Sequence, residues 1–247
     1  MESKFNIPKG WNEVTVEDFL ELRSLETEEF VSFYSKQVSI LSILCLVDET
    51  EFEEMDIDEL GVLMSQLKWL HTQPSVDFKD TVDDLHMIEL NKLTFGQFLD
   101  IEHFISDDYY KNINLIAAIV YGKQRIGEWG ETLFEPYGKI DIWKRADTFK
   151  DILITDIFGI IHHILTWRQG IMDIYSNIFQ PTIDDKDSDD EMSAEDLKEE
   201  EDEQKLEKFY WQFLINDLTD NDVTKIGAVT DLPLIQVMNY ITTKKLR

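Results

Sequence analysis

Residues 94–121 read TFGQFLDIEHFISDDYYKNINLIAAIVY, and this stretch decides the fold class. Thr94 and Gln97 match the capping-box pattern that starts a helix, and apolar residues then recur at three- and four-residue spacing. Residues 113–121 are apolar on all sides, which is typical of a helix buried at the centre of a domain. The stretch therefore predicts two successive helices, the second enclosed by the rest of the fold.

Helical patterns also extend to both sides of this stretch. Thr15 and Asp18 form a second N-capping pattern, and Asp56 precedes a leucine stripe of helical period. Two longer segments carry apolar residues on one helical face: 30–45, with Phe30, Tyr34, Val38, Leu41 and Cys45, and Phe149–Phe179, which Gly170 could bend or divide.

The helical period is interrupted once before residue 94. Apolar and polar residues alternate in Ser75–Asp80 and again in His86–Leu90, so a β-hairpin that turns around Thr81–Asp84 is predicted. The segment Gly122–Gly138 is rich in glycine, and we expect a long loop held by aromatic side chains. These patterns predict a mainly α protein with a small β-hairpin insertion near residues 75–90.

Composition divides the chain into three parts. Residues 1–182 are expected to form the multi-helix body, residues 183–205 an acidic linker, and residues 206–247 a C-terminal module of short helices. Two helices are expected in this module, over residues 221–229 and 233–243, with Pro233 at the first helical position of the second.

The charge balance limits the classes of partner. The 247 residues include 51 acidic and 23 basic side chains, for a net charge of −28. Nucleic-acid affinity comes largely from lysine and arginine, so we expect no direct nucleic-acid binding, and anionic membranes are disfavoured for the same reason. The most apolar run, residues 157–167, is shorter than the ~20 residues that span a bilayer. Residues 1–10 lack the apolar core of a secretory signal.

The acidic segment 184–203 holds thirteen acidic residues against two lysines. Three alternate positions of an EF-hand calcium loop coincide with Asp185, Asp187 and Asp189. The glycine and the bidentate glutamate that such a loop needs are replaced by Asp190 and Asp196. We therefore expect a solvated linker and no specific metal site.

No motif for catalysis or cofactor binding is found. His162 and His163 are adjacent, so on a helix they point about 100° apart and cannot chelate one metal together. His103 has no further ligand at a suitable spacing, and the single Cys45 excludes a thiolate cluster. The glycines Gly122, Gly127 and Gly130 carry no phosphate-loop lysine. The sequence predicts neither enzymatic activity nor a cofactor, although an unrecognised enzyme is kept as an alternative.

The C-terminal module carries more apolar side chains than so short a segment can hide. Those that would bind a partner are expected at the start of its last helix: Leu234, Ile235, Met238 and Tyr240. The competing interpretation is that these side chains cover one another or the body. In a helix-turn-helix reading of the same segment, the second helix opens with Leu234, Ile235, Val237 and Met238, whereas base readout favours Arg, Asn or Gln near that end.

Three segments also carry a resemblance to a known family: Leu93–Ile105 (LTFGQFLDIEHFI), Leu115–Tyr121 (LIAAIVY) and Leu218–Tyr240 (LTDNDVTKIGAVTDLPLIQVMNY). Their order resembles that in proteins of crAss-like and related tailed bacteriophages that infect Bacteroidetes, where an "LTxGQFxD" helix, a buried helix and a "DxTK…LPxxxVxNY" module follow a hairpin. The acidic segment 184–203 has no counterpart in that pattern. The resemblance implies a ring, connector, cargo or tail-assembly chaperone role and transfers no functional residue.

The sequence thus supports one main functional hypothesis. We expect a non-enzymatic virion structural or assembly protein, assembled in the host bacterial cytoplasm and located in the virion, whose partners are other phage structural proteins or further copies of itself. An assembly chaperone that is absent from the mature particle is the first alternative. A helix-turn-helix regulator is the second.

Overall fold

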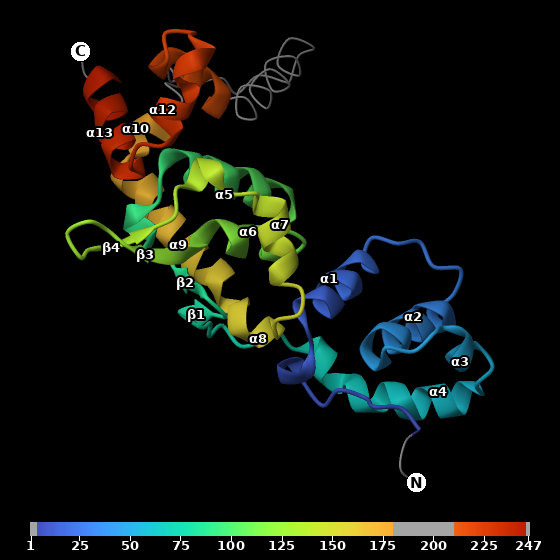
Figure 1. Ribbon diagram of the computed structural model, residues 1–247. Helices are drawn as coiled ribbons and strands as arrows, with labels where there is room; N and C mark the ends of the chain where they lie inside the picture. The colour runs from blue at the N-terminus through green and yellow to red at the C-terminus, as the bar shows by residue number, and fades with distance from the viewer. Residues whose placement is uncertain (1–3, 180–209, 246–247) are drawn as a thin grey trace, which may run out of the picture. The chain divides into compact units, whose positions relative to one another are not determined.

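The computed structural model describes residues 4–179 and 210–245. Within these residues the protein is mainly helical, with one four-stranded antiparallel sheet (Figure 1). This confirms the expected fold class. The predicted linker over residues 183–205, and the calcium-loop positions within it, lie outside the described residues.

The described chain divides into two compact units. Each unit combines two stretches of sequence: Met1–Ile88 with Ile101–Thr166 in the first unit, and Glu89–Asp100 with Trp167–Arg247 in the second. The chain passes between units three times: after Ile88, within α5 (Phe95–Asp108) and within α9 (Gly159–Ile174). The C-terminal helices therefore share a unit with earlier parts of the chain.

The first unit begins with a run of short helices: η1 (Trp11–Glu13), α1 (Val16–Ser24), α2 (Phe33–Cys45), α3 (Thr50–Glu53), α4 (Ile57–Met64) and η2 (Ser65–His71). The predicted cap of α1 is confirmed, because the Thr15 hydroxyl accepts from the Asp18 N–H at 3.1 Å and the Asp18 carboxylate accepts from the Thr15 N–H at 3.1 Å. Helix α2 begins three residues after Phe30, because the Ser32 hydroxyl accepts from the Ser35 N–H and caps it there.

The sheet is built from two hairpins: β1 (Thr81–Val82), β2 (Leu85–Met87), β3 (Tyr121–Ile126) and β4 (Thr132–Phe134), in the order β1-β2-β3-β4. The first hairpin confirms a hairpin near residues 75–90, but its bounds differ from the prediction: Ser75–Asp80 forms no strand, and Thr81–Val82, expected in the turn, form β1. The prediction of a long loop over Gly122–Gly138 is wrong, because half of that segment forms strands. Three consecutive polar residues, Lys123 to Arg125, lie in β3 and hide the alternation on which strand prediction relies.

Helix α6 (Ile113–Val120) is the centre of the first unit, and all eight of its residues are buried. The predicted enclosed helix is therefore confirmed. The end of α6 receives a buried cation from α7 (Ile142–Thr148). The Arg145 guanidinium donates to the carbonyl oxygen of Ala118 in the helix at 3.3 Å and to that of Tyr121, the residue after the helix, at 2.8 Å. A short helix, η4 (Tyr137–Lys139), connects β4 to α7.

The segment Phe149–Phe179 forms three helices where the sequence predicts one: α8 (Ile154–Ile157), α9 and α10 (Ser176–Phe179). Gly170, which could have bent or divided the segment, lies inside α9 without a break. The helix is instead interrupted between α8 and α9, before Gly159. The N–H of Gly159 donates to the carbonyl oxygen of Asp77 at 3.2 Å. A backbone contact between distant segments, which propensity does not encode, thus sets the start of α9.

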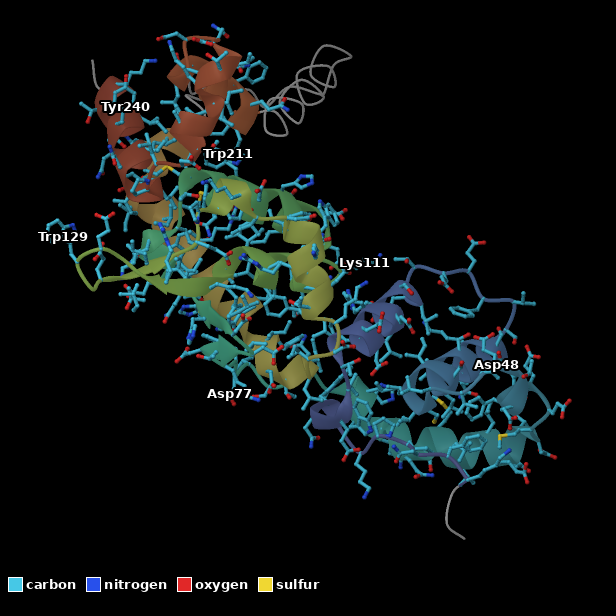
Figure 2. All side chains as sticks on the ribbon, viewed as in Figure 1. Asp48, Asp77, Lys111, Trp129, Trp211 and Tyr240 are labelled. Atoms are coloured by element: carbon cyan, nitrogen blue, oxygen red, sulfur yellow. The ribbon has the colours of Figure 1, made fainter. Side chains whose placement is uncertain are left out.

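The second unit contains η3 (Leu90–Lys92), the start of α5, the end of α9, α10, a helix over residues 210–218, η5 (Val223–Lys225), α12 (Ile226–Thr230) and α13 (Leu234–Lys245). The capping box of α5 is confirmed, because the Gln97 side chain accepts from the Thr94 N–H at 2.9 Å and the Thr94 hydroxyl accepts from the Gln97 N–H at 3.2 Å. The loop of the β3–β4 hairpin holds Trp129, whose side chain extends away from the sheet (Figure 2).

Two glycines of α9 give a matched test of this packing. A Cβ at Gly159 would lie 1.8 Å from the carbonyl oxygen of Val76, whereas a Cβ at Gly170 meets nothing within 4 Å. We expect Gly159→Ala to lower the free energy of unfolding by more than about 3 kcal/mol, and Gly170→Ala to raise it by up to about 1 kcal/mol. Urea denaturation of both variants measures this, and equal effects would contradict the described entry into α9.

Candidate functional site

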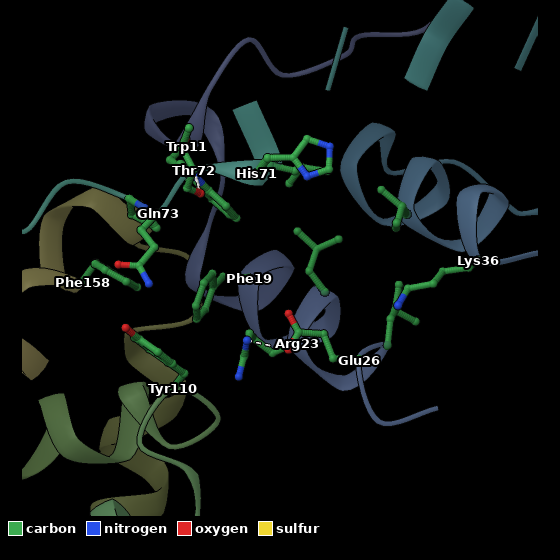
Figure 3. A pocket seen from close by; sticks show the side chains of 15 residues that line it. Trp11, Phe19, Arg23, Glu26, Lys36, His71, Thr72, Gln73, Tyr110 and Phe158 are labelled. Carbon is green, nitrogen blue, oxygen red and sulfur yellow. Dashed lines mark hydrogen bonds and ion pairs between the residues drawn. The ribbon is translucent and has the colours of Figure 1, made fainter. Parts of the chain in front are cut away.

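Two clefts lie in the first unit. The aromatic cleft has a volume of about 310 Å³, and its walls include Trp11, Phe19, Arg23, Tyr110 and Phe158 (Figure 3). The polar cleft has a volume of about 350 Å³ and lies beside β2, β3 and α7. Both volumes are near the lower end of those that hold small ligands. A catalytic cleft of this size would also need an acid, a base or a nucleophile in its lining.

Charged side chains of the polar cleft pair with one another. Lys123 Nζ lies 2.7 Å from Asp84 Oδ2, and the buried Arg145 guanidinium bonds to the Glu135 carboxylate. The hydrogen bond from Lys123 lowers the pKa of the Asp84 carboxyl and raises the pKa of the Lys123 amine. Both shifts favour the charged forms, so this pair is poorly suited to transfer protons near neutral pH.

The aromatic cleft also contains a paired arginine. Arg23 Nη1 lies 2.6 Å from Glu26 Oε2, and the guanidinium carbon lies 5.3 Å from the centre of the Tyr110 ring. Its Nε atom is buried and has no hydrogen-bond partner. Over the described lining of this cleft, no hydrogen bond joins a nucleophile to a base. The cleft therefore offers an arginine donor among aromatic rings rather than a catalytic pair.

The cysteine and histidines that the sequence analysis considered are placed apart. Burial raises the pKa of the Cys45 thiol to about 11, so this side chain is almost wholly protonated at neutral pH. His162 and His163 are both exposed on α9, and the ring of His163 lies 5.3 Å from that of Phe78. No group of three or more candidate ligands suited to a metal ion is found in the described part of the chain.

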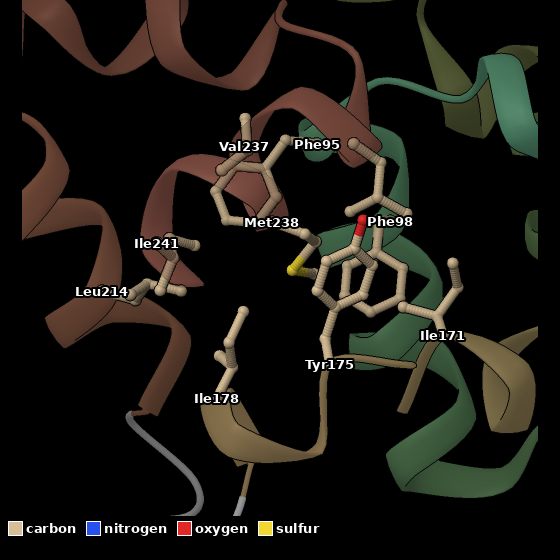
Figure 4. Packing of buried hydrophobic residues seen from close by; sticks show 10 residues of the cluster. Phe95, Phe98, Ile171, Tyr175, Ile178, Leu214, Val237, Met238 and Ile241 are labelled. Carbon is tan, nitrogen blue, oxygen red and sulfur yellow. The ribbon is translucent and has the colours of Figure 1, made fainter. Parts of the chain in front are cut away.

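The core of the second unit forms around α13. Four of its residues lie on one face of the helix and are buried: Leu234, Val237, Met238 and Ile241. They pack against side chains from α5, from α9 and α10, and from the helix over residues 210–218 (Figure 4). Two backbone hydrogen bonds fix the start of α13, from the Phe95 N–H to the Leu232 carbonyl oxygen at 2.8 Å and from the Leu234 N–H to the Leu93 carbonyl oxygen at 3.0 Å.

The predicted partner-binding residues divide between this core and the surface. Leu234 and Met238 are fully buried, so the structure places them in the core rather than on a docking surface. Ile235 is half-buried and packs against the same core. Tyr240 is 59% exposed and projects from α13 (Figure 2). Of the four predicted residues, Tyr240 offers the largest accessible apolar surface to a partner.

A second exposed aromatic residue, Phe213, lies on the neighbouring helix and is 57% exposed. Lys244 Nζ lies 2.7 Å from Asp217 Oδ2, which joins the two helices. Phe213 precedes Asp217 by one helical turn, and Tyr240 precedes Lys244 by one turn. Both rings therefore lie toward the side where the ion pair joins the helices, and we call Phe213 and Tyr240 the C-terminal aromatic face.

Phe213 is not among the four partner-binding residues predicted from the sequence. The distinguishing signal is its helical phase, because the flanking Trp211, Leu214, Ile215 and Leu218 pack against the core and leave Phe213 on the opposite side. That phase cannot be assigned until the start of the helix is known.

Comparison with known proteins finds no protein-family model, no curated protein and no solved structure that matches this chain. Among the helices of the described residues, none combines the length and the apolar character needed to cross a membrane.

Substitutions on α13 separate its buried and exposed sides. Met238→Asp places a charge in the core, so we expect it to lower the free energy of unfolding by more than about 3 kcal/mol. Tyr240→Asp changes an exposed side chain, so its effect should stay within about 0.5 kcal/mol. Thermal unfolding followed by circular dichroism measures both. A stable Met238→Asp variant would show that α13 does not pack as described.

Proposed function

We propose that this chain is a non-enzymatic structural or assembly protein of a tailed bacteriophage and acts through contacts with other proteins. The observation that carries the proposal is the C-terminal aromatic face. Phe213 and Tyr240 are large, solvent-exposed aromatic side chains on two helices that pack on one core. Aromatic residues on a fixed scaffold are favoured at the centres of protein interfaces, because little entropy is lost when they are buried.

The charge of the chain supports the same class of function. A net charge of −28 opposes nonspecific contact between copies and favours association through surfaces of complementary charge. Such a protein resists aggregation in the host cytoplasm until its partner is present. We infer that the partners are other phage structural proteins and that the assembled location is the virion.

The specific link to phages rests on the resemblance of three sequence segments. The segment Leu218–Tyr240 lies in the second unit, at α12–α13, and Leu93–Ile105 begins there and continues along α5 into the first unit. The resemblance therefore includes the unit that carries the C-terminal aromatic face. Whether the protein stays in the particle or acts as an assembly chaperone and leaves is decided by experiment.

A DNA-binding regulator remains the alternative from another class. In a helix-turn-helix arrangement α13 would enter the major groove with its first residues. Leu234 and Val237 are buried in the core, and Lys244 is paired with Asp217. The protein-contact proposal is favoured because two residues at the start of α13 are committed to the core and a basic residue near its end is committed to an ion pair.

Mass spectrometry of purified particles tests the proposal. In cells that produce the phage, we expect the chain in the particle at a fixed copy number; a chaperone would instead be bound to a structural protein before assembly and absent from the particle. Absence from both the particle and every complex with a structural protein would contradict the proposal.

Two substitutions locate the contact. Phe213→Asp and Tyr240→Asp should each weaken incorporation at least about tenfold, because an interface centre loses more than 1.4 kcal/mol when an anchor is replaced by a charge. Trp143→Asp is the matched control, since Trp143 is an exposed aromatic residue of the first unit. Equal incorporation of all three folded variants would show that the C-terminal aromatic face is not the contact.

A further inference from the structure

The hairpin tip, residues 127–131, presents a tryptophan on a fixed loop. The backbone N–H of Gly127 donates to the Glu131 carbonyl oxygen at 2.8 Å, and the backbone N–H of Trp129 donates to the Glu131 carboxylate at 2.9 Å. Gly130 has a φ of 81°, a conformation that glycine adopts without strain. The loop is thus closed by its own hydrogen bonds, and its shape does not depend on a partner.

Trp129 is the most exposed tryptophan in the described structure, at 92% of its surface. Tryptophan is highly buried on average, because its large apolar surface is costly to keep in water. On a preorganised loop, it can be buried in a partner with little loss of conformational entropy. The hairpin tip therefore has the properties of an anchor that inserts into a pocket.

The aromatic cleft has the properties of a receptor for such an anchor. Its rings are already arranged around one another: Tyr110 stacks on Phe158 with centroids 5.3 Å apart, and Phe19 meets Phe158 edge-on at 5.9 Å. Trp11 meets Phe19 at 5.8 Å. The volume of about 310 Å³ accommodates one indole side chain, and its walls offer the edge and face contacts that aromatic pairs prefer.

Arg23 adds a specific requirement to this cleft. Its Nη atoms face Glu26 and Asp108, at 2.6 Å and 3.6 Å, but its buried Nε–H has no acceptor. This N–H is closed to solvent, so an occupant of the cleft meets the exposed part of the Arg23 side chain, 26% of its surface, rather than Nε. The guanidinium can also lie against a further ring, and tryptophan is the strongest partner for a cation. The occupant that suits the cleft carries an indole and a nearby carboxylate.

The hairpin tip carries both groups. Glu128 and Glu131 flank Trp129, whereas the lining of the cleft includes Arg23, Lys36 and His71 against the single carboxylate of Glu26. With histidine neutral, Arg23 and Lys36 against Glu26 leave the lining one net positive charge, whereas Glu128 and Glu131 give the tip two negative charges. Every copy of the chain carries both surfaces, and Trp129 is exposed rather than seated in its own cleft.

We propose that the hairpin tip of one copy of this chain binds in the aromatic cleft of a second copy. The contact joins two different surfaces, so it is heterologous and leaves a free tip and a free cleft on each pair. Contacts of this type produce rings where the rotation closes and open chains where it does not. The inference concerns self-association and does not depend on the partner of the C-terminal aromatic face.

Two variants of the full chain and their mixture test the contact. Trp129→Ala removes the indole and leaves the cleft open, whereas Leu22→Trp fills the cleft, which Leu22 lines, and leaves the tip intact. In analytical ultracentrifugation the wild type should associate with a Kd between about 1 µM and 1 mM, as expected for a small interface. Each variant alone should associate at least about tenfold more weakly. Their equimolar mixture should form a one-to-one dimer and no larger species.

Several results would overturn the proposal: a wild type that stays monomeric at about 1 mM, Trp129→Ala self-association equal to that of the wild type, or a mixture that stays monomeric. Trp129-dependent binding to phosphatidylcholine vesicles without self-association would assign the tip to a membrane surface instead.

Trp143→Ala is the matched control and should associate like the wild type. Lys36→Glu, which reverses a charge at the cleft, replaces Leu22→Trp if thermal unfolding shows that the latter does not fold. Tyr240→Asp should self-associate normally, which separates this contact from the proposed function.

Discussion

The enclosure of α6 is the constraint on which the first unit depends. A helix with eight buried residues ends in carbonyl groups that water cannot reach, and such groups need a partner. Arg145 supplies it, but a buried guanidinium needs a counter-charge, which Glu135 provides. Glu135 follows β4 directly, and its N–H donates to the Lys123 carbonyl oxygen of β3 at 3.1 Å. The second hairpin is therefore required to return a carboxylate to the end of α6, and the exposed Trp129 lies in the loop that this return creates.

The second unit rests on a different principle, which is the amphipathic character of α13. Its buried face closes a core with residues from four other segments, and its two backbone hydrogen bonds to residues 93–95 fix its start. Because this face packs into the core, Tyr240, which lies outside it on α13, remains exposed. The same argument applies to Phe213, because its neighbours Trp211 and Leu214 face the core. Exposure of the C-terminal aromatic face thus follows from the packing of the buried face.

The features predictable from the sequence are those that local chemistry determines. The caps at Thr15 and Thr94 and the buried helix over residues 113–120 follow from neighbouring residues. The strands β3 and β4 could not be predicted, because their pairing with β2 and the role of Glu135 depend on contacts distant in sequence. The start of α9 at Gly159 depends likewise on Val76 and Asp77. For the candidate site, composition identified the C-terminal module, but only the packing of α13 separates Met238 from Tyr240.

We propose that Tyr240 contacts a structural protein of a tailed bacteriophage. Incorporation of the photo-crosslinking residue benzoylphenylalanine at position 240, with position 143 as the exposed reference, measures that contact directly in phage-producing cells. The account predicts one dominant adduct at position 240 with a phage structural protein, and no comparable adduct at position 143. The same products at both positions, or none at position 240, would contradict it.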